Sequence, residues 1–216
     1  MLPHLRLTTS WSDDPPRPPE LDHLRKTWSE SPAIADQLAL TKSNIGLRES
    51  LQFLATRDPL TGRFNRRHLD DSIDREFSRS KRNNSPVAAW MVDIDHFKAF
   101  NDTHGHPAAD RVLAEFGRLL RTSCRDMDLA CRFGGEEFVV ILPDCTREDA
   151  ARRAEAFREK VANTALEITV SVGVAEFPGD GHSWEMVLRR ADDALYQAKR
   201  TGRNRVVLAS REQEGA

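Results

Sequence analysis

Apolar residues fall into two spacings along the chain, and the first predicts β-strands. Residues 86–94, "PVAAWMVDI", are almost continuously apolar, which is typical of a strand covered on both faces. Residues 166–177 alternate between apolar and polar side chains, which is the two-residue period of a strand. The same patterns predict further strands at 128–133, 137–142 and 205–208.

The second spacing repeats every three or four residues and predicts amphipathic helices. In residues 107–123, Val112, Phe116 and Leu119 fall on one side of such a helix. Further helices are expected at 64–82, 147–162 and 183–200. From residue 86 onwards the order is β-α-β-β-α-β followed by α-β. This order predicts an α+β fold with a ferredoxin-like βαββαβ core, an additional helix and strand, and helices on one face of an antiparallel sheet.

The chain is expected to divide into a leader, a helical stalk, a compact domain and a flexible tail. In the leader, the prolines of "SDDPPRPPE" block helix and strand alike. Pro59 should end the stalk helix, because the residue before a proline avoids the α-helical region. The four parts are expected at residues 1–30, 31–56, 57–210 and 211–216.

Leucines of the stalk repeat every seven residues, at Leu40, Leu47 and Leu54. Asn44 and Leu51 stand at the intervening positions of the repeat. In the heptad notation of coiled coils, the repeating leucines are then at position d and Asn44 is at position a. This is typical of a parallel two-stranded coiled coil. The repeat is short, and a single amphipathic helix lying on its own domain has the same pattern. Both interpretations stay open.

Composition narrows the class of protein. Hydrophobic residues make up 39% and charged residues 31%, as in soluble globular proteins. The formal net charge is -2, so the chain lacks the excess of positive charge that is typical of nucleic-acid-binding proteins, and nucleic-acid binding is not expected. No apolar run is long enough for a membrane span, and the first residues lack the apolar core of a signal peptide. The cysteines Cys124, Cys131 and Cys145 have no metal-binding spacing, so we expect reduced thiols and a cytoplasmic location.

Acidic residues stand at two points where predicted strands end. Asp93 closes the buried strand 86–94, and Glu136 and Glu137 follow the turn Gly134-Gly135. The split βαβ topology places this strand beside the hairpin, so Asp93 and Glu136 should meet. Converging carboxylates repel one another unless a cation neutralises them. Their oxygens suit Mg²⁺, which binds one or two carboxylates together with phosphate oxygens.

Residues after Asp93 add features that suit a nucleotide. Lys98 offers a positive charge, and the strand-to-helix turn offers backbone N–H groups to phosphate. Asn101 and Asp110 carry the acceptors that would recognise the edge of guanine. Each feature has a simpler interpretation. Asp95 could cap a helix that begins at His96, Asp110 could face solvent, and the glutamates could form an exposed hairpin tip.

Taken together, these motifs resemble the GGDEF family of diguanylate cyclases. The segment "GGEEF" at 134–138 resembles the family signature, and "RDPLTGRFNRR" at 57–67 resembles its entry motif. The segments "DIDHFKAFND", "HGHPAAD" and "ADDALYQAKRTGRNRV" resemble its metal, nucleotide and closing-helix segments. The resemblance covers residues 57–208. One departure is Ala109, where the family has glycine.

The resemblance implies a fold akin to the palm of polymerases and a role for each matched residue. Asp93, Glu136 and the carbonyl of Ile94 would bind Mg²⁺, with Mn²⁺ as a substitute, and Glu137 would assist proton removal. The substrate GTP would be held by the following residues: Phe97, Lys98, Asn101, Asp110, Gly135, Lys199 and Arg203. Two GTP molecules would condense to cyclic di-GMP with release of two pyrophosphates, in a homodimer formed through the stalk and the active-site face. The alternative is a catalytically silent domain that acts as a receptor for GTP or cyclic di-GMP.

A second candidate site precedes the hairpin. The segment "RDMD" places Arg125 three residues before Asp128, which matches the RxxD product-inhibition site of the family. The simpler interpretation is a salt bridge within the loop, worth about 0–1 kcal/mol. His104 and His106 form an HxH pair, but no further ligand stands at zinc spacing, so we do not expect a zinc site.

Overall fold

The computed structural model describes residues 32–210. The predicted leader and tail lie outside the described residues. The chain separates into two compact units, with the boundary between Leu51 and Gln52, and each is described by itself.

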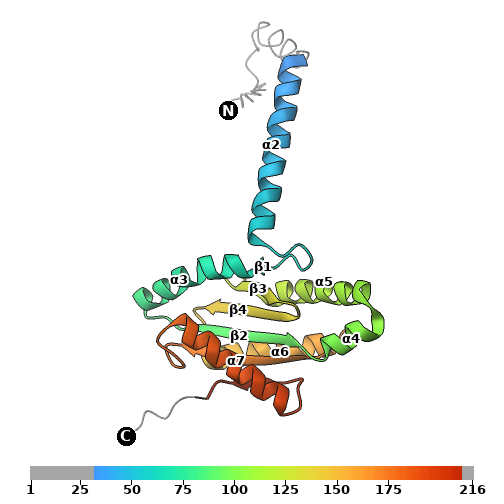
Figure 1. Cartoon of the computed structure of the whole chain (residues 1–216). Helices are drawn as coiled ribbons and strands as arrows, with labels where there is room; N and C mark the ends of the chain where they lie inside the picture. The colour runs from blue at the N-terminus through green and yellow to red at the C-terminus, as the bar shows by residue number, and fades with distance from the viewer. Residues whose placement is uncertain (1–31, 211–216) are drawn as a thin grey trace, which may run out of the picture. The chain divides into compact units, whose positions relative to one another are not determined.

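Helices and strands follow one another in the order shown in Figure 1. The helices are α2 (Pro32–Thr56), α3 (Arg66–Asn83), α4 (Phe97–His104), α5 (His106–Ser123), α6 (Arg147–Ala162) and α7 (Trp184–Arg200). The strands are β1 (Phe64–Asn65), β2 (Val87–Ile94), β3 (Leu129–Gly134), β4 (Glu137–Pro143), β5 (Val170–Phe177) and β6 (Val206–Leu208). The predicted elements are confirmed within a few residues, but strand β1 and the separate helix α4 were missing from the predicted order.

The strands form one sheet in the order β1-β3-β4-β2-β5-β6. Strand β2 is antiparallel to both of its neighbours, β4 and β5, so it occupies the centre as predicted. The four central strands are antiparallel, which confirms the ferredoxin-like core. The edge strands β1 and β6 pair parallel with β3 and β5, so the complete sheet is mixed.

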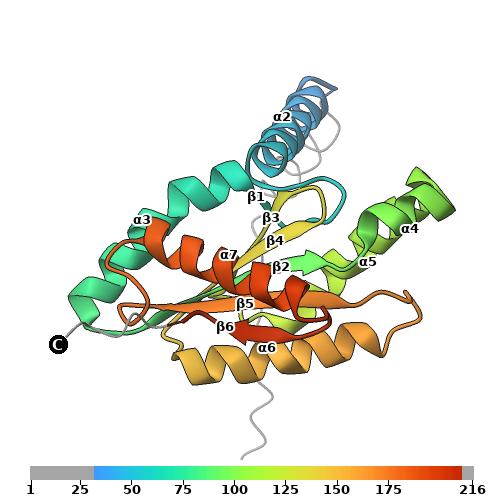
Figure 2. The ribbon, with the colours of Figure 1, turned by 60° about the horizontal axis from the view of Figure 1, so that its bottom comes forward.

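Helices cover both faces of the sheet, and our expectation of cover on one face was wrong. Trp90 and Val92 of β2 pack in a cluster with α5 and α6, whereas Ala89 and Met91 pack in a second cluster with α3 and α7. Figure 2 shows α7 and α6 on opposite sides of the sheet. All eight residues of β2 are buried. The continuous apolar run of this strand already required cover on both faces.

Side-chain caps fix where three helices begin. Asn65 accepts a hydrogen bond from the backbone N–H of His68 and thereby starts α3. Thr146 caps α6, and Ser183 caps α7. Each cap satisfies one N–H group that the first turn of a helix leaves unpaired.

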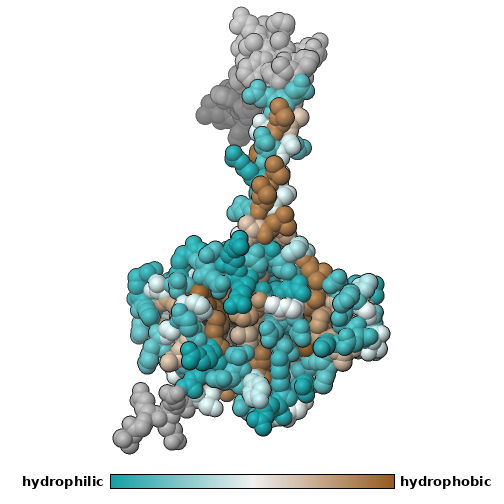
Figure 3. Space-filling view, viewed as in Figure 1, coloured by the Kyte–Doolittle hydropathy of each residue, from teal (hydrophilic) through white to brown (hydrophobic). Residues whose placement is uncertain are grey.

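Helix α2 exposes large apolar side chains along its length, as the brown atoms in Figure 3 show. Leu40, Leu47 and Leu54 are 65%, 58% and 59% exposed. The helix itself was predicted, and a parallel coiled coil stays a prediction. Among the described residues, no helix is both long enough and apolar enough to cross a membrane.

Candidate active site

Strands β2 and β4 bring the predicted carboxylates to one edge of the sheet. Asp93 pairs with Glu137 in the register of the two strands. The backbone N–H of Ile94 lies 3.4 Å from the carbonyl oxygen of Glu136. Residues opposite one another in an antiparallel pair have side chains on the same face. The topology therefore unites residues that lie far apart in sequence, as we expected.

The turn between β3 and β4 is held by an arginine that sequence analysis missed. Gly135 has a φ of +46°, which glycine adopts at little cost. Arg132 donates two hydrogen bonds to the Gly135 carbonyl, at 2.9 and 2.8 Å. It also binds the Asp58 carboxylate at 3.1 Å, so it joins the glycine turn to the entry segment. Its position three residues before Gly135 was the available signal.

Lysine from the last helix neutralises Asp93. The ammonium nitrogen of Lys199 lies 2.7 Å from the Asp93 carboxylate. Burial raises the pKa of Asp93 to about 6, the Lys199 contact opposes this rise, and the charges of Glu136 and Glu137 add to it. Both glutamates are therefore close enough to interact with Asp93. Three carboxylates beside one buried position create a demand for positive charge.

The donor set fits a hard divalent ion that shares its coordination with a ligand. Asp93 and Glu136 could supply carboxylate oxygens, and the Ile94 carbonyl could complete the protein part. Among the described residues, no cluster of three or more histidine, cysteine, aspartate or glutamate residues could enclose a metal alone. Mg²⁺ usually binds one or two carboxylates together with water and phosphate oxygens, so this pair of carboxylates and one carbonyl suits it. The Lys199 ammonium shows that the position accepts a cation.

Asp95 has a structural role, and its interpretation as a helix cap was wrong. His96 has a φ of 57° and starts α4 without a side-chain cap. The buried Asp95 carboxylate accepts hydrogen bonds from the hydroxyls of Thr169 and Ser171, both at 2.7 Å. It also accepts one from the Asn204 backbone N–H at 3.0 Å. Asp95 thus ties β2 to β5 and to the segment after α7.

The predicted guanine ligands lie on α4 and α5. The Oδ1 atom of Asn101 is buried and has no hydrogen-bond partner within the described residues. A buried acceptor without a partner is costly, so a ligand donor there would be favourable. Asp110 is exposed on α5. Ala109 is buried and packs in the core cluster near the start of α5.

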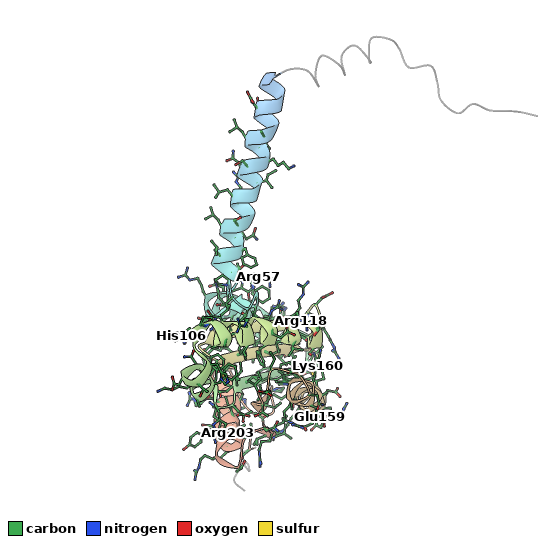
Figure 4. All side chains as sticks on the ribbon, turned by 90° about the vertical axis from the view of Figure 1, so that its right-hand side faces the viewer. Arg57, His106, Arg118, Glu159, Lys160 and Arg203 are labelled. Atoms are coloured by element: carbon green, nitrogen blue, oxygen red, sulfur yellow. The ribbon has the colours of Figure 1, made fainter. Side chains whose placement is uncertain are left out.

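The predicted phosphate ligands are partly brought together. Lys199 reaches Asp93 at the centre, whereas Lys98 is exposed on α4 and Phe97 is buried. Arg203 has a φ of 61° in the turn after α7. Figure 4 shows Arg203 at the opposite end of the compact domain from Arg57. His104 contacts the Phe100 carbonyl at 3.1 Å, which is a local contact within α4.

The RxxD residues do not form the loop salt bridge that we considered. The Asp128 carboxylate accepts a 2.7 Å hydrogen bond from the backbone N–H of Arg125, and its ion-pair partner is Arg153 of α6. Arg125 lines a pocket of about 330 Å³ with Asp149, Arg152, Arg153 and Ala156, and Arg152 is paired with Asp149. The second oxygen of Asp128 is buried and has no partner in the part of the chain that the structure describes.

A match to a protein-family model identifies the family of this chain. Residues 55–205 match the model described as "Diguanylate cyclase, GGDEF domain". The chain belongs to the GGDEF diguanylate cyclase family. Its GGDEF domain is also similar to the response regulator PleD of Caulobacter vibrioides, with 42% identity over 199 residues. That alignment covers 88% of this chain but 42% of PleD, so the chain spans less than half the length of this relative.

Solved structures agree with this family. The coiled coil and GGDEF domain of DgcB from Caulobacter crescentus, in complex with c-di-GMP, gives a TM-score of 0.72 at 35% identity. The match covers 82% of this chain and 97% of that chain. The active GGEEF domain of a diguanylate cyclase from Vibrio cholerae gives a TM-score of 0.65 at 35% identity, covering 68% and 98% of the two chains. The predicted family and fold class are therefore confirmed.

Proposed function

We propose that this GGDEF domain condenses two GTP molecules into cyclic di-GMP and releases two pyrophosphates. The observation that carries the proposal is the register that places Asp93 opposite Glu137, with Glu136 in the adjoining turn. The related Vibrio cholerae domain has the same GGEEF sequence and is described as active. GTP is a cytoplasmic nucleotide, and we propose a cytoplasmic location.

Asp93, Glu136 and the Ile94 carbonyl would hold a divalent ion, Mg²⁺ or Mn²⁺. When bound, this ion lowers the pKa of the attacking 3′-hydroxyl and offsets charge on the phosphoryl oxygens. Lys199, which pairs with Asp93 in this structure, would be available to contact phosphate when a divalent ion takes its place beside the carboxylate. Glu137, opposite Asp93, is placed to assist removal of the hydroxyl proton.

Nucleotide recognition uses the groups around this centre. Asn101 offers its unpaired Oδ1 atom to a guanine N–H group, and Asp110 accepts from a second one. Phe97 and the backbone of the β2–α4 turn position the phosphates, with charge from Lys98 and Arg203. Gly135 allows the nucleotide to approach the hairpin backbone.

Two domains must face each other, because each presents one GTP and the product is symmetric. A two-fold axis then relates the two active sites. A parallel coiled coil of α2 would raise the local concentration of one domain beside the other. The exposed leucines of α2 support this role, and the related DgcB structure contains a coiled coil.

Cyclic di-GMP is also proposed as an inhibitor at the RxxD site. The 330 Å³ pocket presents Arg125 and Arg152, whose planar guanidinium groups suit guanine and phosphate. The unpaired oxygen of Asp128, which lines a second pocket together with Arg125, offers an acceptor. The related DgcB domain was crystallised with c-di-GMP. Arg125→Ala should retain turnover and lose product inhibition, and an unchanged inhibition curve would contradict this role.

The direct test is incubation of the chain with GTP and Mg²⁺, with the products separated by chromatography. We expect cyclic di-GMP and pyrophosphate in a ratio of one to two. A dimeric sample that forms no cyclic di-GMP would contradict the proposal and favour the silent receptor. A monomeric cyclic nucleotide as product would also contradict it.

A further inference from the structure

Asp95 is a buried carboxylate that has no ion-pair partner within residues 32–210. Its exposed fraction is 5%, and burial of such a charge is costly unless hydrogen bonds compensate for the lost water. The hydroxyls of Thr169 and Ser171 and the backbone N–H of Asn204 all donate to this carboxylate. Thr169 and Ser171 lie at the start of β5, whereas Asn204 follows α7. Asp95 therefore joins three parts of the domain.

The segment after α7 that Asp95 contacts is residues 201–205, which we call the closing turn. It contains Arg203, one of the proposed phosphate ligands, and it follows the helix that carries Lys199. Arg203 and Asn204 have φ angles of 61° and 45°, in the left-handed region. An arginine keeps this conformation only where surrounding contacts fix it. The position of Arg203 therefore depends on the contacts of the closing turn with the rest of the domain.

Hydrogen bonds on both sides of Arg203 supply these contacts. The backbone N–H of Arg203 donates to the Ala198 carbonyl in the last turn of α7 at 2.9 Å. The backbone N–H of Asn204 donates to the Asp95 carboxylate at 3.0 Å. The side-chain oxygen of Asn204 accepts a hydrogen bond from the guanidinium of Arg158 on α6 at 2.8 Å. The residue after Arg203 is thus held at its backbone by Asp95 and at its side chain by Arg158.

The backbone of Asp95 belongs to the other segment that is proposed to contact phosphate. Asp95 lies two residues after Asp93, and His96 directly after it starts α4 without a side-chain cap. The backbone N–H of Asp95 donates to the Thr169 carbonyl at 2.9 Å, which fixes this end of β2 against the start of β5. Asp95 therefore connects the β2–α4 turn to the closing turn.

We propose that Asp95 and Arg158 are positioning residues for phosphate recognition, which act by holding Asn204 and so Arg203 in place. This role rests on the proposed condensation of GTP, and neither side chain needs to touch the nucleotide. A guanidinium that is held in position beforehand loses less conformational entropy when it binds. Displacement of a binding group by about 1 Å can cost about 100-fold in rate. The buried charge of Asp95 thereby serves the geometry of the active site.

Amide hydrogen exchange of Asn204, measured by NMR on the ¹⁵N-labelled chain without nucleotide, tests the Asp95 contact directly. Asp95→Ala should accelerate this exchange at least tenfold, because a hydrogen-bonded amide must open before it exchanges. Asp95→Asn should restore slow exchange, since its side-chain oxygen can accept from Asn204 while its amide group donates to the Ser171 hydroxyl. Exchange in Asp95→Ala that equals the wild type would overturn the role of Asp95.

Ser171→Ala is the matched control for this measurement. Ser171 donates to Oδ1 of Asp95, whereas Asn204 donates to Oδ2. The control therefore removes one hydrogen bond from the same buried carboxylate and leaves the contact with the closing turn. We expect a lower melting temperature and Asn204 exchange within twofold of the wild type. An acceleration in Ser171→Ala as large as that in Asp95→Ala would show that Asp95 only stabilises the fold, and would overturn its positioning role.

Arg158→Met keeps the buried carboxylate, so it tests the positioning role even if Asp95→Ala fails to fold. Binding of the α,β-methylene analogue of GTP, which cannot react, should be measured by calorimetry with Mg²⁺. We expect Arg158→Met to bind the analogue about fivefold more weakly, as for the loss of one hydrogen bond of average strength. Arg203→Gln combined with Arg158→Met should bind no more weakly than Arg203→Gln alone, because Arg158 acts through Arg203.

Arg118→Met on α5 is the control for the arginine variant. Arg118 pairs with a glutamate three residues earlier on its own helix, as Arg158 does, and Figure 4 shows it apart from Arg203. This control should bind the analogue within twofold of the wild type. Undiminished binding in Arg158→Met, or losses that multiply in the double variant, would overturn the positioning role alone. A wild-type chain that neither binds the analogue nor forms cyclic di-GMP would instead contradict the proposed function, and the positioning role with it.

Discussion

At the level of single residues, Asp93 shows how the chain holds charge in its active site. The carboxylate is buried and beside two glutamates, yet it remains paired because Lys199 reaches it from α7. The Lys199 ammonium is a single point charge, whereas an arginine would bind the carboxylate through two hydrogen bonds. A metal ion can therefore displace this lysine more readily than it could displace an arginine. In the proposed mechanism, a divalent ion would take the place of the Lys199 ammonium beside Asp93.

Glu136→Gln should abolish turnover while leaving the fold intact. The amide keeps the size of the side chain but removes a charged metal ligand, so we expect at least a 100-fold loss in the rate of cyclic di-GMP formation. Glu136 is half-buried and forms no ion pair within the described residues, so the melting temperature should change little. Normal activity in this variant, measured by chromatography, would contradict the ligand role.

Sequence analysis located the carboxylates but not the basic residues that organise them. Asp93 and Glu136 could be placed together because the order of strands determines which ends adjoin. The contacts of Lys199 with Asp93 and of Arg132 with Asp58 depend on side-chain reach across the fold, which periodicity does not report. The misinterpretation of Asp95 has the same cause, since its partners lie on β5 and after α7.

At the level of elements, the close packing of α7 against strand β5 determines where Lys199 lies. Strand β5 has Gly173 where the helix crosses it. A β-carbon there would lie 1.9 Å from the Ala191 carbonyl oxygen and 2.3 Å from the Leu195 nitrogen. These are backbone atoms, so the contact can be relieved only if the helix moves.

Gly173→Ala should therefore destabilise the domain and reduce turnover together. We expect a loss of about 3 kcal/mol or more in the free energy of unfolding, and a melting temperature lower by roughly 10 °C. Gly46→Ala on α2 is the control, since a β-carbon there meets nothing within 4 Å. Thermal unfolding measures both, and equal melting temperatures for the two variants would contradict the close packing of α7.

The turn of residues 57–64 makes a pH-dependent contribution to stability through Asp58. Burial favours a higher pKa for this carboxyl, but hydrogen bonds from Thr61 and the charge of Arg132 hold the pKa below its usual value. A lowered pKa in the folded state stabilises the fold above the unfolded pKa of about 4. This contribution is lost as the pH falls through the lowered value.

Asp58→Asn should cost about 1 kcal/mol at pH 7, because Arg132 loses its charged partner while the asparagine can still accept from Thr61. The difference from the wild type should shrink towards zero as the pH falls below the folded pKa of Asp58. Urea unfolding at pH 7 and at progressively lower pH measures this. A difference that stays constant, or grows, towards acid pH would contradict the ion pair.

Strand β1 was not predicted and the helix cover was predicted on one face only, and both errors have physical causes. Strand β1 is two residues long, too short to show a period, and it forms because Phe64 and Asn65 pair with β3. Cover on both faces of the sheet could have been inferred, since the apolar run of residues 86–94 leaves no solvated face. The pattern of a four-stranded antiparallel core predicts helices on one face, and it does not assign a face to α3 and α7.

For the whole molecule, sequence predicted the order of the elements and the fold class, because both follow from patterns repeated over many residues. The way in which two chains assemble does not follow from these patterns. The leucines of α2 are exposed on the single chain, and their partner is not specified by the sequence. A dimer formed through α2 makes turnover depend on protein concentration.

Replacing Leu47 and Leu54 together with lysine should weaken the dimer. We expect the rate per chain to fall at low protein concentration and to recover as concentration rises, since the active site itself is unchanged. Lys42→Ala on the same helix is the control and should behave as the wild type. Sedimentation and cyclic di-GMP formation should be measured over the same concentration range. Concentration-independent rates in both variants would contradict the dimeric mechanism.

The most direct measurement is the position of the metal ion itself. Crystals of the chain grown with Mn²⁺ and a non-hydrolysable GTP analogue would locate manganese by its anomalous scattering. We predict a peak within about 2.0–2.3 Å of carboxylate oxygens from both Asp93 and Glu136, with Lys199 moved from Asp93 to the phosphates. Manganese bound elsewhere, with Lys199 still on Asp93 and the analogue present, would contradict the proposed active site.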